Sequence, residues 1–322
     1  MSEGPDLPSF DLAACRGRIG PSGEPRPDAE TLRAVHLAHA LAISFENLDP
    51  LLGVAPGLGR EELSAKLLGW RRGGYCYEHD TLFDWALEAA IGYPVTRPAA
   101  RVVPGAERFT SRPRTQMDLL VHVPGEAGAA GTDTPYLVDV GFGAVTTVLE
   151  PLPLVANREP EAAGRRHPLV RAPHDGPPEL WVPETYLVGK GEWQAQYAFT
   201  VEPFGHQDFE VVNWFIATSP RSLFSRRLYA QRTAADHHLV LDDRRLSVTN
   251  ADGTATEREL VDDAEARRVL SEDFGITAPD GMALLLRPPG DGPGALGRTG
   301  SSAAGAGTDI VRRARVRRQP PD

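Results

Sequence analysis

The spacing of apolar residues changes near residue 93, and this change limits the folds open to the chain. Before it, residues 28–43, 60–68 and 76–91 carry apolar side chains at the spacing of amphipathic helices. After it, short segments rich in β-branched residues follow, and residues 115–123 alternate with the period of a β-strand. A block of helices followed by a block of strands predicts an α+β fold.

The remaining segments extend this pattern. Strands are predicted at 95–103, 136–140, 145–149, 180–188 and 193–201, with exposed loops at 124–135 and 157–178. The last block predicts a helix at 207–217, strands at 238–242 and 245–249, and a helix at 262–273. Beyond residue 288 the chain is rich in Gly, Ala and Ser and then basic, which predicts a disordered tail at 289–322.

Charge and cysteine content exclude several classes of protein. The 322 residues carry a net charge of -10, so the chain has no overall attraction to nucleic acid or to an anionic membrane. No apolar run reaches the roughly 18 residues that a membrane-spanning helix needs. The two cysteines, Cys15 and Cys76, have no metal-site spacing. We therefore expect a cytoplasmic protein without a disulfide framework or a metal site.

Cys76 is the strongest candidate for a reactive residue. It follows Gly73-Gly74-Tyr75 and opens the helix predicted at 76–91. The glycines allow a sharp turn into the helix, whose free N–H groups and positive dipole end stabilise a thiolate. The same N–H groups can hold the oxyanion of a tetrahedral intermediate. Cys15 has no such context, and we interpret it as an inert core residue.

Two polar residues on neighbouring predicted strands are candidate partners of this cysteine. Asp139 follows an apolar strand, so it either orients a catalytic base or anchors a turn. Gln116 lies near the start of the preceding strand. Adjacent antiparallel strands would bring residues 116 and 139 side by side. We expect the Gln116 amide to lie within hydrogen-bond reach of both the Cys76 sulfur and the Asp139 carboxylate.

Four segments together resemble the arylamine N-acetyltransferase family. The family's motifs are Arg-Gly-Gly-x-Cys-x-Glu-x-Asn, Pro-Arg-Thr-His-Met, Val-Asp-Val-Gly-Phe-Gly and Pro-Phe-Glu-Asn-Leu. The corresponding segments here are 72–80 (RGGYCYEHD), 113–117 (PRTQM), 138–143 (VDVGFG) and 44–48 (SFENL). The similarity covers about residues 30–277 in consistent order.

This resemblance implies a fold, a reaction and a set of site residues. The implied fold is a three-domain, cysteine-protease-like arrangement: a helical bundle at 1–92, a β-barrel at 93–202 and an α/β lid at 203–288. Cys76 would attack acetyl-CoA or another acyl-CoA, and a small aromatic amine would then take the acyl group from the thioester. Implied catalytic residues are Cys76, Gln116 and Asp139; implied pocket residues are Phe45, Tyr75, Gly141, Phe142 and Gly143; implied supporting residues are Arg72, Glu46 and Asp80.

Two positions depart from the family's pattern. The family's catalytic His is Gln116 here, and the Asn that closes its first motif is Asp80. A neutral imidazole can accept a thiol proton near pH 7, whereas an amide cannot. If Asp80 and Asp139 lie close together, one of them could have a raised pKa and carry the proton. His79 is a second possible substitute, although we favour a solvated helix residue at that position.

Three functions remain open at this point. The first is acyl-CoA-dependent N- or O-acyl transfer to an aryl amine, with no permanently bound cofactor. The second is an amide synthase that releases a carrier-bound polyketide chain onto an amine, for which an acyl carrier protein would be the partner. The third is an inactive homologue that only binds acyl-CoA. None of them involves nucleic acid or a membrane.

Overall fold

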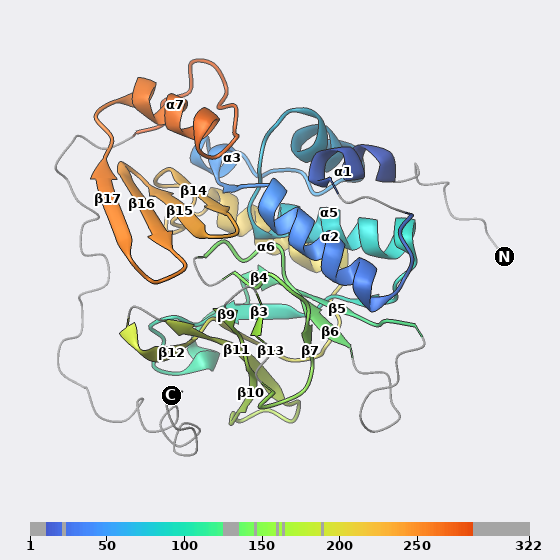
Figure 1. Cartoon of the computed structure of the whole chain (residues 1–322). Coiled ribbons are helices and arrows are strands. Elements are labelled where there is room, and N and C mark those ends of the chain that lie inside the picture. Colours follow the sequence, from blue (N-terminus) through green and yellow to red (C-terminus); the bar gives the residue numbers. More distant parts are fainter. Residues whose placement is uncertain are drawn as a thin grey trace.

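The computed structural model describes residues 11–20, 24–124, 135–144, 147–158, 161–162, 165–187 and 190–285. In Figure 1 the helices of the first ninety residues lie together, one group of sheets lies below them, and a separate sheet with its own helix lies beside them. The tail at 289–322 and most of the loop at 124–135 lie outside the described residues. The arrangement confirms the predicted α+β class.

The N-terminal part contains the three predicted helices and two more. The helices are α1 (Leu12–Ile19), α2 (Ala29–Ala42), α3 (Leu48–Leu51), α4 (Arg60–Leu63) and α5 (Cys76–Trp85). π-Helical turns at Ser64–Gly69 and Ala86–Ile91 extend α4 and α5 to the predicted lengths. Asp28 caps α2 as predicted, because its carboxylate accepts the Thr31 N–H at 2.8 Å.

The middle part consists of open antiparallel sheets. Its strands are β2 (Val95–Thr96), β3 (Ala99–Val102), β4 (Gln116–Met117), β5 (Leu119–Val121), β6 (Tyr136–Val138), β7 (Leu152–Pro153), β8 (Glu161–Ala162), β9 (Arg165–Arg166), β10 (Leu169–Ala172), β11 (Leu180–Leu187), β12 (Glu192–Ala195) and β13 (Tyr197–Phe199). One sheet has the order β10-β11-β13-β3-β4, with β12 on β11, and another has the order β2-β5-β6-β7. The described strands close no barrel, so the implied β-barrel is wrong.

Two further expectations for this part are wrong. Residues 147–149 form no strand, although a strand was predicted at 145–149. The segment 157–178 is not a continuous loop, because β10 within it pairs with β11. The strand pattern of β10 is not evident in the sequence, because the surrounding segment is rich in proline and charged residues. In the structure only Leu169 of this strand is fully buried, and Arg171 lies over the ring of Trp181.

The C-terminal part is a helix followed by an antiparallel sheet and a second helix. Its elements are α6 (His206–Thr218), β14 (Tyr229–Thr233), β15 (His237–Asp242), β16 (Arg245–Asn250), β17 (Ala255–Glu259) and α7 (Asp263–Glu272). The sheet has the order β1-β14-β15-β16-β17, in which β1 is Phe45–Glu46. Strands β1, β14 and β17 were not predicted. Because β1 comes from the N-terminal part, this pairing ties the two ends of the fold together.

One apolar core joins all three parts. It contains Tyr75 and Cys76 from the start of α5, Met117 from β4, Val138 from β6 and Phe209 from α6. The domain boundaries at 92 and 202 stay predictions, since this core crosses both. Cys76 therefore sits where the helical part meets the sheets.

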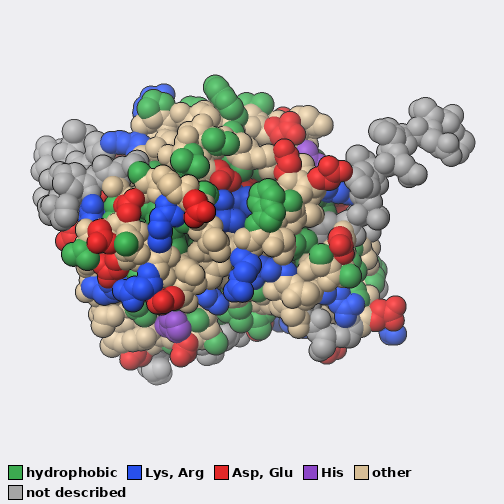
Figure 2. All heavy atoms as spheres, turned by 90° about the horizontal axis from the view of Figure 1, so that it is seen from above, with side chains coloured by type: hydrophobic (Ala, Val, Ile, Leu, Met, Phe, Trp, Pro, Cys, Tyr) green, Lys and Arg blue, Asp and Glu red, His purple; other side chains and the backbone are tan. Residues whose placement is uncertain are grey.

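The outer face shows no dominance of one sign of charge where it is visible. Figure 2 shows acidic and basic side chains intermixed over the face seen from above, with apolar side chains between them. Within the described part of the chain, no helix is both long and apolar enough to cross a membrane.

A network of buried ion pairs holds the chain before and after the start of α5. Lys66 Nζ donates to Asp49 Oδ2 at 2.5 Å and to Glu78 Oε1 at 2.6 Å. Arg72 donates to Glu46 Oε1 at 2.7 Å and to Asp49 Oδ1 at 2.9 Å. Burial alone would lower the pKa of Lys66, but Glu78 and the other carboxylates raise it above its ordinary value. Lys66 therefore stays charged inside the protein.

We predict that Lys66→Met destabilises the protein strongly. It leaves buried Glu78 without its cation and Asp49 with Arg72 alone, and breaking a buried pair this way costs about 3–5 kcal/mol. The free energy of unfolding in urea measures the loss. Arg245→Met is the control, because Arg245 pairs with Glu257 on the exposed surface and should cost no more than about 1 kcal/mol. Equal small losses would contradict a structural role for the network.

Candidate active site

The turn before α5 brings Cys76 to the helix start, as predicted. Glu78 accepts the Tyr75 N–H at 3.1 Å and so caps the first turn. A Cβ at Gly74 would collide with the Glu78 side chain, and one at Gly73 would collide with the carbonyl oxygen of Ser44. Only glycine fits at these two positions, because the backbone passes so close to its neighbours.

The thiol of Cys76 is buried in surroundings that disfavour its thiolate. It is 5% exposed, and its Sγ donates to the Thr115 carbonyl oxygen at 3.9 Å. Burial raises the pKa of Cys76 well above its ordinary value, and Asp80 raises it further. The Tyr77 N–H at the helix start acts in the opposite direction. The expected thiolate stabilisation by the helix is therefore present but outweighed, because burial and negative neighbours dominate.

Asp139 anchors the loop that follows β6. Its Oδ1 accepts the N–H groups of Gly141 at 3.1 Å and of Phe142 at 2.8 Å. Its backbone carbonyl accepts a hydrogen bond from His36 Nε2 at 3.0 Å. Burial raises the pKa of the Asp139 carboxyl to about 6, and the nearby Tyr197 hydroxyl opposes this although it does not reach hydrogen-bond geometry. Asp139 therefore anchors the turn after β6, which is one of the two roles that its sequence position allowed.

Gln116 is buried, but its side chain is occupied elsewhere. The amide nitrogen donates to the Met117 carbonyl oxygen at 2.9 Å. Within the described residues, hydrogen bonds from Gln116 to Cys76 or to Asp139 are not formed. Strand β4 pairs with β3 through Gln116, whereas β5 pairs with β6 through Leu119 and Val138. The predicted neighbouring strands exist, but Gln116 itself belongs to the other sheet.

Two further carboxyls are buried near the thiol. Asp80 lies on α5 and accepts the Val140 N–H at 3.4 Å through Oδ1. Asp118 lies between β4 and β5, flanked by buried Met117 and Leu119. Both influence the pKa of Cys76. Our sequence analysis missed Asp118, although a carboxylate inside an apolar strand was the signal that could have revealed it.

The implied pocket residues come from several elements. Phe45 packs its ring against His79 at a centroid distance of 6.5 Å, and Gly143 lies so close to Phe45 that a Cβ would collide with it. The Phe142 ring meets Tyr197 at 5.2 Å. Tyr75 is fully buried, and its hydroxyl donates to the side chain of Asn213 on α6. Arg72 and Glu46, the implied supporting residues, pair with each other as described above.

His79 is not the solvated residue that we expected. It is 2% exposed, and its Nδ1 lies 3.0 Å from His39 Nε2. Its Nε2 lies 3.3 Å from the Ser44 carbonyl oxygen, to which it must donate, so its Nδ1 accepts from His39. Burial lowers the pKa of His79 to about 4, so the ring is neutral at pH 7. Both of its nitrogens are engaged away from Cys76.

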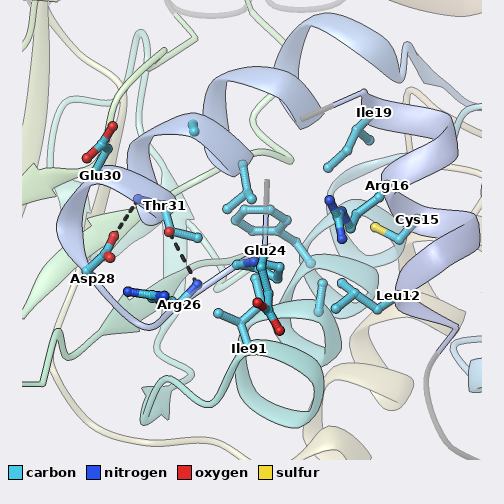
Figure 3. Close-up of a pocket in the computed structure, with 15 residues that line it drawn as sticks. Leu12, Cys15, Arg16, Ile19, Glu24, Arg26, Asp28, Glu30, Thr31 and Ile91 are labelled. Atoms are coloured by element: carbon cyan, nitrogen blue, oxygen red, sulfur yellow. Dashed lines mark hydrogen bonds between the residues drawn. The ribbon is translucent and has the colours of Figure 1, made fainter. Parts of the chain in front are cut away.

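A cavity of about 280 Å³ lies apart from this site, between α1, α2 and α5 (Figure 3). Its wall includes Cys15, Arg16 and Thr31 rather than Cys76. Burial raises the pKa of the Cys15 thiol to about 11. This cavity does not belong to the candidate active site. Within the described residues, no three His, Cys, Asp or Glu side chains are placed to hold a metal ion.

Comparison with known proteins gives one consistent result. A family model described as N-acetyltransferase matches residues 28–281. The chain is similar to the arylamine N-acetyltransferase of Mycolicibacterium smegmatis, with 38% identity over 275 residues, which are 84% of this chain and 94% of that protein. It is 33% identical over 261 residues to an arylamine N-acetyltransferase / N-hydroxyarylamine O-acetyltransferase of Salmonella typhimurium, covering 79% of this chain and 84% of that one.

Solved structures agree with the sequence comparison. The arylamine N-acetyltransferase of Nocardia farcinica superposes with a TM-score of 0.75 at 38% identity, covering 85% of this chain and 95% of that one. The Mycobacterium marinum arylamine N-acetyltransferase in complex with CoA superposes with a TM-score of 0.73 at 36% identity, covering 83% and 93%.

We predict that Asp118→Asn stabilises the protein at pH 8 but not at pH 4. Burial raises the pKa of Asp118 well above its ordinary value, and Asp139 raises it further. The folded state therefore binds this proton more tightly than the unfolded state, and stability falls as pH rises from about 4 through the raised pKa. Asparagine removes this penalty. A rise in Tm of about 2–4 °C at pH 8 corresponds to ~1 kcal/mol.

Scanning calorimetry at pH 4, 6 and 8 measures this difference, with Asp280→Asn as a control at an exposed carboxyl. A loss of stability at pH 8 in the Asp118 variant would show that the carboxylate is compensated in the folded protein.

Proposed function

Because the chain belongs to the arylamine N-acetyltransferase family and is therefore an acyltransferase, we propose that it moves an acetyl group from acetyl-CoA to a small aromatic amine through a thioester on Cys76. The observation that carries this proposal is the position of Cys76. It opens α5 in the family's motif and lies among Asp80, Asp118 and the Asp139 loop. The M. marinum relative was solved with CoA, which supports CoA as the carrier of the acyl group.

The proposed reaction has two steps. Cys76 sulfur attacks the carbonyl carbon of the thioester, and CoA leaves as its thiol. An aryl amine then attacks acetyl-Cys76 and releases the free cysteine. The Tyr77 N–H, which lowers the pKa of Cys76, is suited to stabilise the developing oxyanion. The name of the S. typhimurium relative includes O-acetyl transfer to hydroxyarylamines, so hydroxylamine oxygen is a second acceptor to test.

The amide synthase reading has less support. The relatives named above are arylamine N-acetyltransferases, and an acyl carrier protein as a partner has no support among them. The inactive-homologue reading depends on Gln116, because this residue cannot serve as a base.

We predict that acetyl-CoA leaves one acetyl group on Cys76. Intact-protein mass spectrometry in the absence of amine should show a single acetyl adduct on the wild type and on Cys15→Ala, but none on Cys76→Ala. Cys15 is the matched control because it is the chain's other cysteine and is also buried. An adduct from a carrier-bound thioester but not from acetyl-CoA would favour the amide synthase. No adduct from either donor would support the hypothesis that the chain is an inactive homologue.

We further predict that Gln116→His speeds acetylation of Cys76. An imidazole at this position supplies the family's base, and general-base catalysis contributes about 10²–10⁴-fold, so we expect a rise on the order of 10². Rapid-quench mass spectrometry with acetyl-CoA measures the rate. Gln194→His is a control on the distant strand β12. A slower Gln116→His enzyme would show that an imidazole at this position does not take the thiol proton.

A further inference from the structure

Three buried carboxyls lie near the reactive thiol. Asp80, Asp118 and Asp139 are each exposed by 1% or less. Each has at least one oxygen without a hydrogen-bond partner in the described part of the chain: Oδ2 of Asp80 and Asp139, and both oxygens of Asp118. A buried carboxyl with unused oxygens is costly and needs a reason. Such groups are concentrated at sites where protons move.

Asp80 is the carboxyl on the same helix as the nucleophile. It lies four residues after Cys76 on α5, so both residues share one face of the helix, and its side chain leans toward the helix start. A Cβ at Gly141 would touch both the Asp80 Oδ2 and the Cys76 carbonyl oxygen. Because Oδ1 takes the Val140 N–H, Oδ2 is the oxygen left for another proton donor.

Among the described residues, no cation acts strongly enough on the Asp118 carboxyl to explain its burial. The Gln116 amide favours its charged form but does not reach hydrogen-bond geometry. Its other strong influences are burial and the Asp139 carboxyl. By contrast, Asp84, the next buried carboxyl along α5, pairs with Arg97 at 2.7 Å. On α5, Glu78 and Asp84 each meet a cation, whereas Asp80 between them meets the other two carboxyls of the cluster.

The other groups near the thiol are unsuited to accept its proton. Gln116 is an amide, and the Thr115 carbonyl can hold a proton only by hydrogen bonding. His36 is bonded through Nε2 to the Asp139 backbone, and burial lowers its pKa to about 4. Asp139 holds its loop through Oδ1, and although its Oδ2 is unused it acts on the pKa of Cys76 less strongly than Asp80 does. The hydroxyls of Tyr77 and Tyr197 face the cluster, and burial raises the pKa of both.

We propose that Asp80 accepts the proton of the Cys76 thiol in place of the absent imidazole, and that Asp118 is a positioning residue that acts on Asp80 through its charge. This inference rests on the proposed function and names the proton path of the same site. The proposal links the two departures from the family's motifs. The base that is missing at Gln116 is replaced by the carboxyl of Asp80, and Asp118 acts on that carboxyl.

The proton and the electrons balance in each half of the reaction. The thiol proton moves to Asp80 Oδ2 as a sulfur electron pair forms the bond to the acetyl carbon. The oxyanion then collapses, the bond between that carbon and the CoA sulfur breaks, and the CoA thiolate takes the proton back from Asp80. In the second half, the amine nitrogen attacks the same carbon and gives its proton to Asp80. The oxyanion then collapses, the bond between the acetyl carbon and the Cys76 sulfur breaks, and the Cys76 thiolate takes the proton back from Asp80.

The electrostatics of the cluster suit this role. Burial raises the pKa of Asp80 well above its ordinary value, and Asp139 and then Asp118 raise it further. A base works best when its pKa lies near the working pH, and an ordinary aspartate is too weak. The same carboxyls raise the pKa of Cys76. Charge on Asp118 therefore has two opposite effects: it hinders formation of a free thiolate and strengthens the base.

Because the two effects are opposite, the thiolate fraction and the acetylation rate should change in opposite directions. A residue with only a structural role would not produce this result. The variants are Asp80→Asn, which restores the residue of the family's motif, and Asp118→Asn. Alkylation of Cys76 by iodoacetamide, in a Cys15→Ala background, reports the thiolate fraction as a function of pH. Rapid-quench mass spectrometry with acetyl-CoA reports acetylation of Cys76 over the same pH range. Asp280→Asn is the control for loss of one charge at an exposed position.

We expect both variants to alkylate faster at pH 8, because a negative neighbour of the thiol is gone. We expect acetylation at pH 7 to fall on the order of 10²-fold in Asp80→Asn, the low end of general-base effects. In Asp118→Asn we expect a smaller fall, with the midpoint of the acetylation profile moved to lower pH, because Asp80 has lost a like charge. Asp280→Asn should match the wild type in both assays.

Other outcomes overturn the proposal in distinct ways. If acetylation rises together with alkylation in either variant, the carboxyls only repel the thiolate and Asp80 is not the base. If Asp118→Asn lowers acetylation without moving the pH midpoint, its charge does not act on Asp80. If wild-type Cys76 alkylates normally but never gains an acetyl group, the proposed function fails, and this proton path fails with it.

Discussion

The fold depends on five charged side chains before and at the start of α5, four of them buried and Asp49 partly exposed. Lys66 and Arg72 join Asp49, Glu46 and Glu78 through contacts of 2.5–2.9 Å. These contacts fix the backbone on both sides of the nucleophile, because Glu46 belongs to β1 and Glu78 caps the first turn of the helix. In a medium of low dielectric constant each of these charges would be costly alone. The two cations offset two of the three carboxylates, and burial raises the pKa of the Glu78 carboxyl to about 7.

The opposite situation holds one turn further along the same helix. Asp80 faces Asp118 and Asp139 with no cation among the principal influences on their pKa values. Natural proteins keep such uncompensated groups where function needs them, at the expense of stability. The ion-pair network at the helix start lies beside this cluster, because Glu78 and Asp80 are two residues apart on α5. The ten residues of α5 thus carry both a carboxyl that stabilises the fold through an ion pair, Glu78, and a carboxyl of the cluster near the thiol, Asp80.

Much of this protein was determined by local sequence alone. The helices at 28–43, 60–68 and 76–91 follow from apolar spacing, caps and glycine turns, which are properties of neighbouring residues. The order of four motifs was enough to identify the family that the comparisons confirm. The position of Cys76 at a helix start followed from the two glycines before it, because their lack of a Cβ is a local requirement.

Only the tertiary structure decided what surrounds these elements. The strand period placed Gln116 and Asp118 on the polar face of 115–123, but both are buried, since α5 packs against β4 and the second sheet continues through β5. His79 is buried for a similar reason, as α2 brings His39 against it. Strand β1 could not be predicted, because its partner β14 lies far along the chain. Periodicity reports which residues share a face, whereas the charge, burial and pKa of a side chain depend on what that face meets.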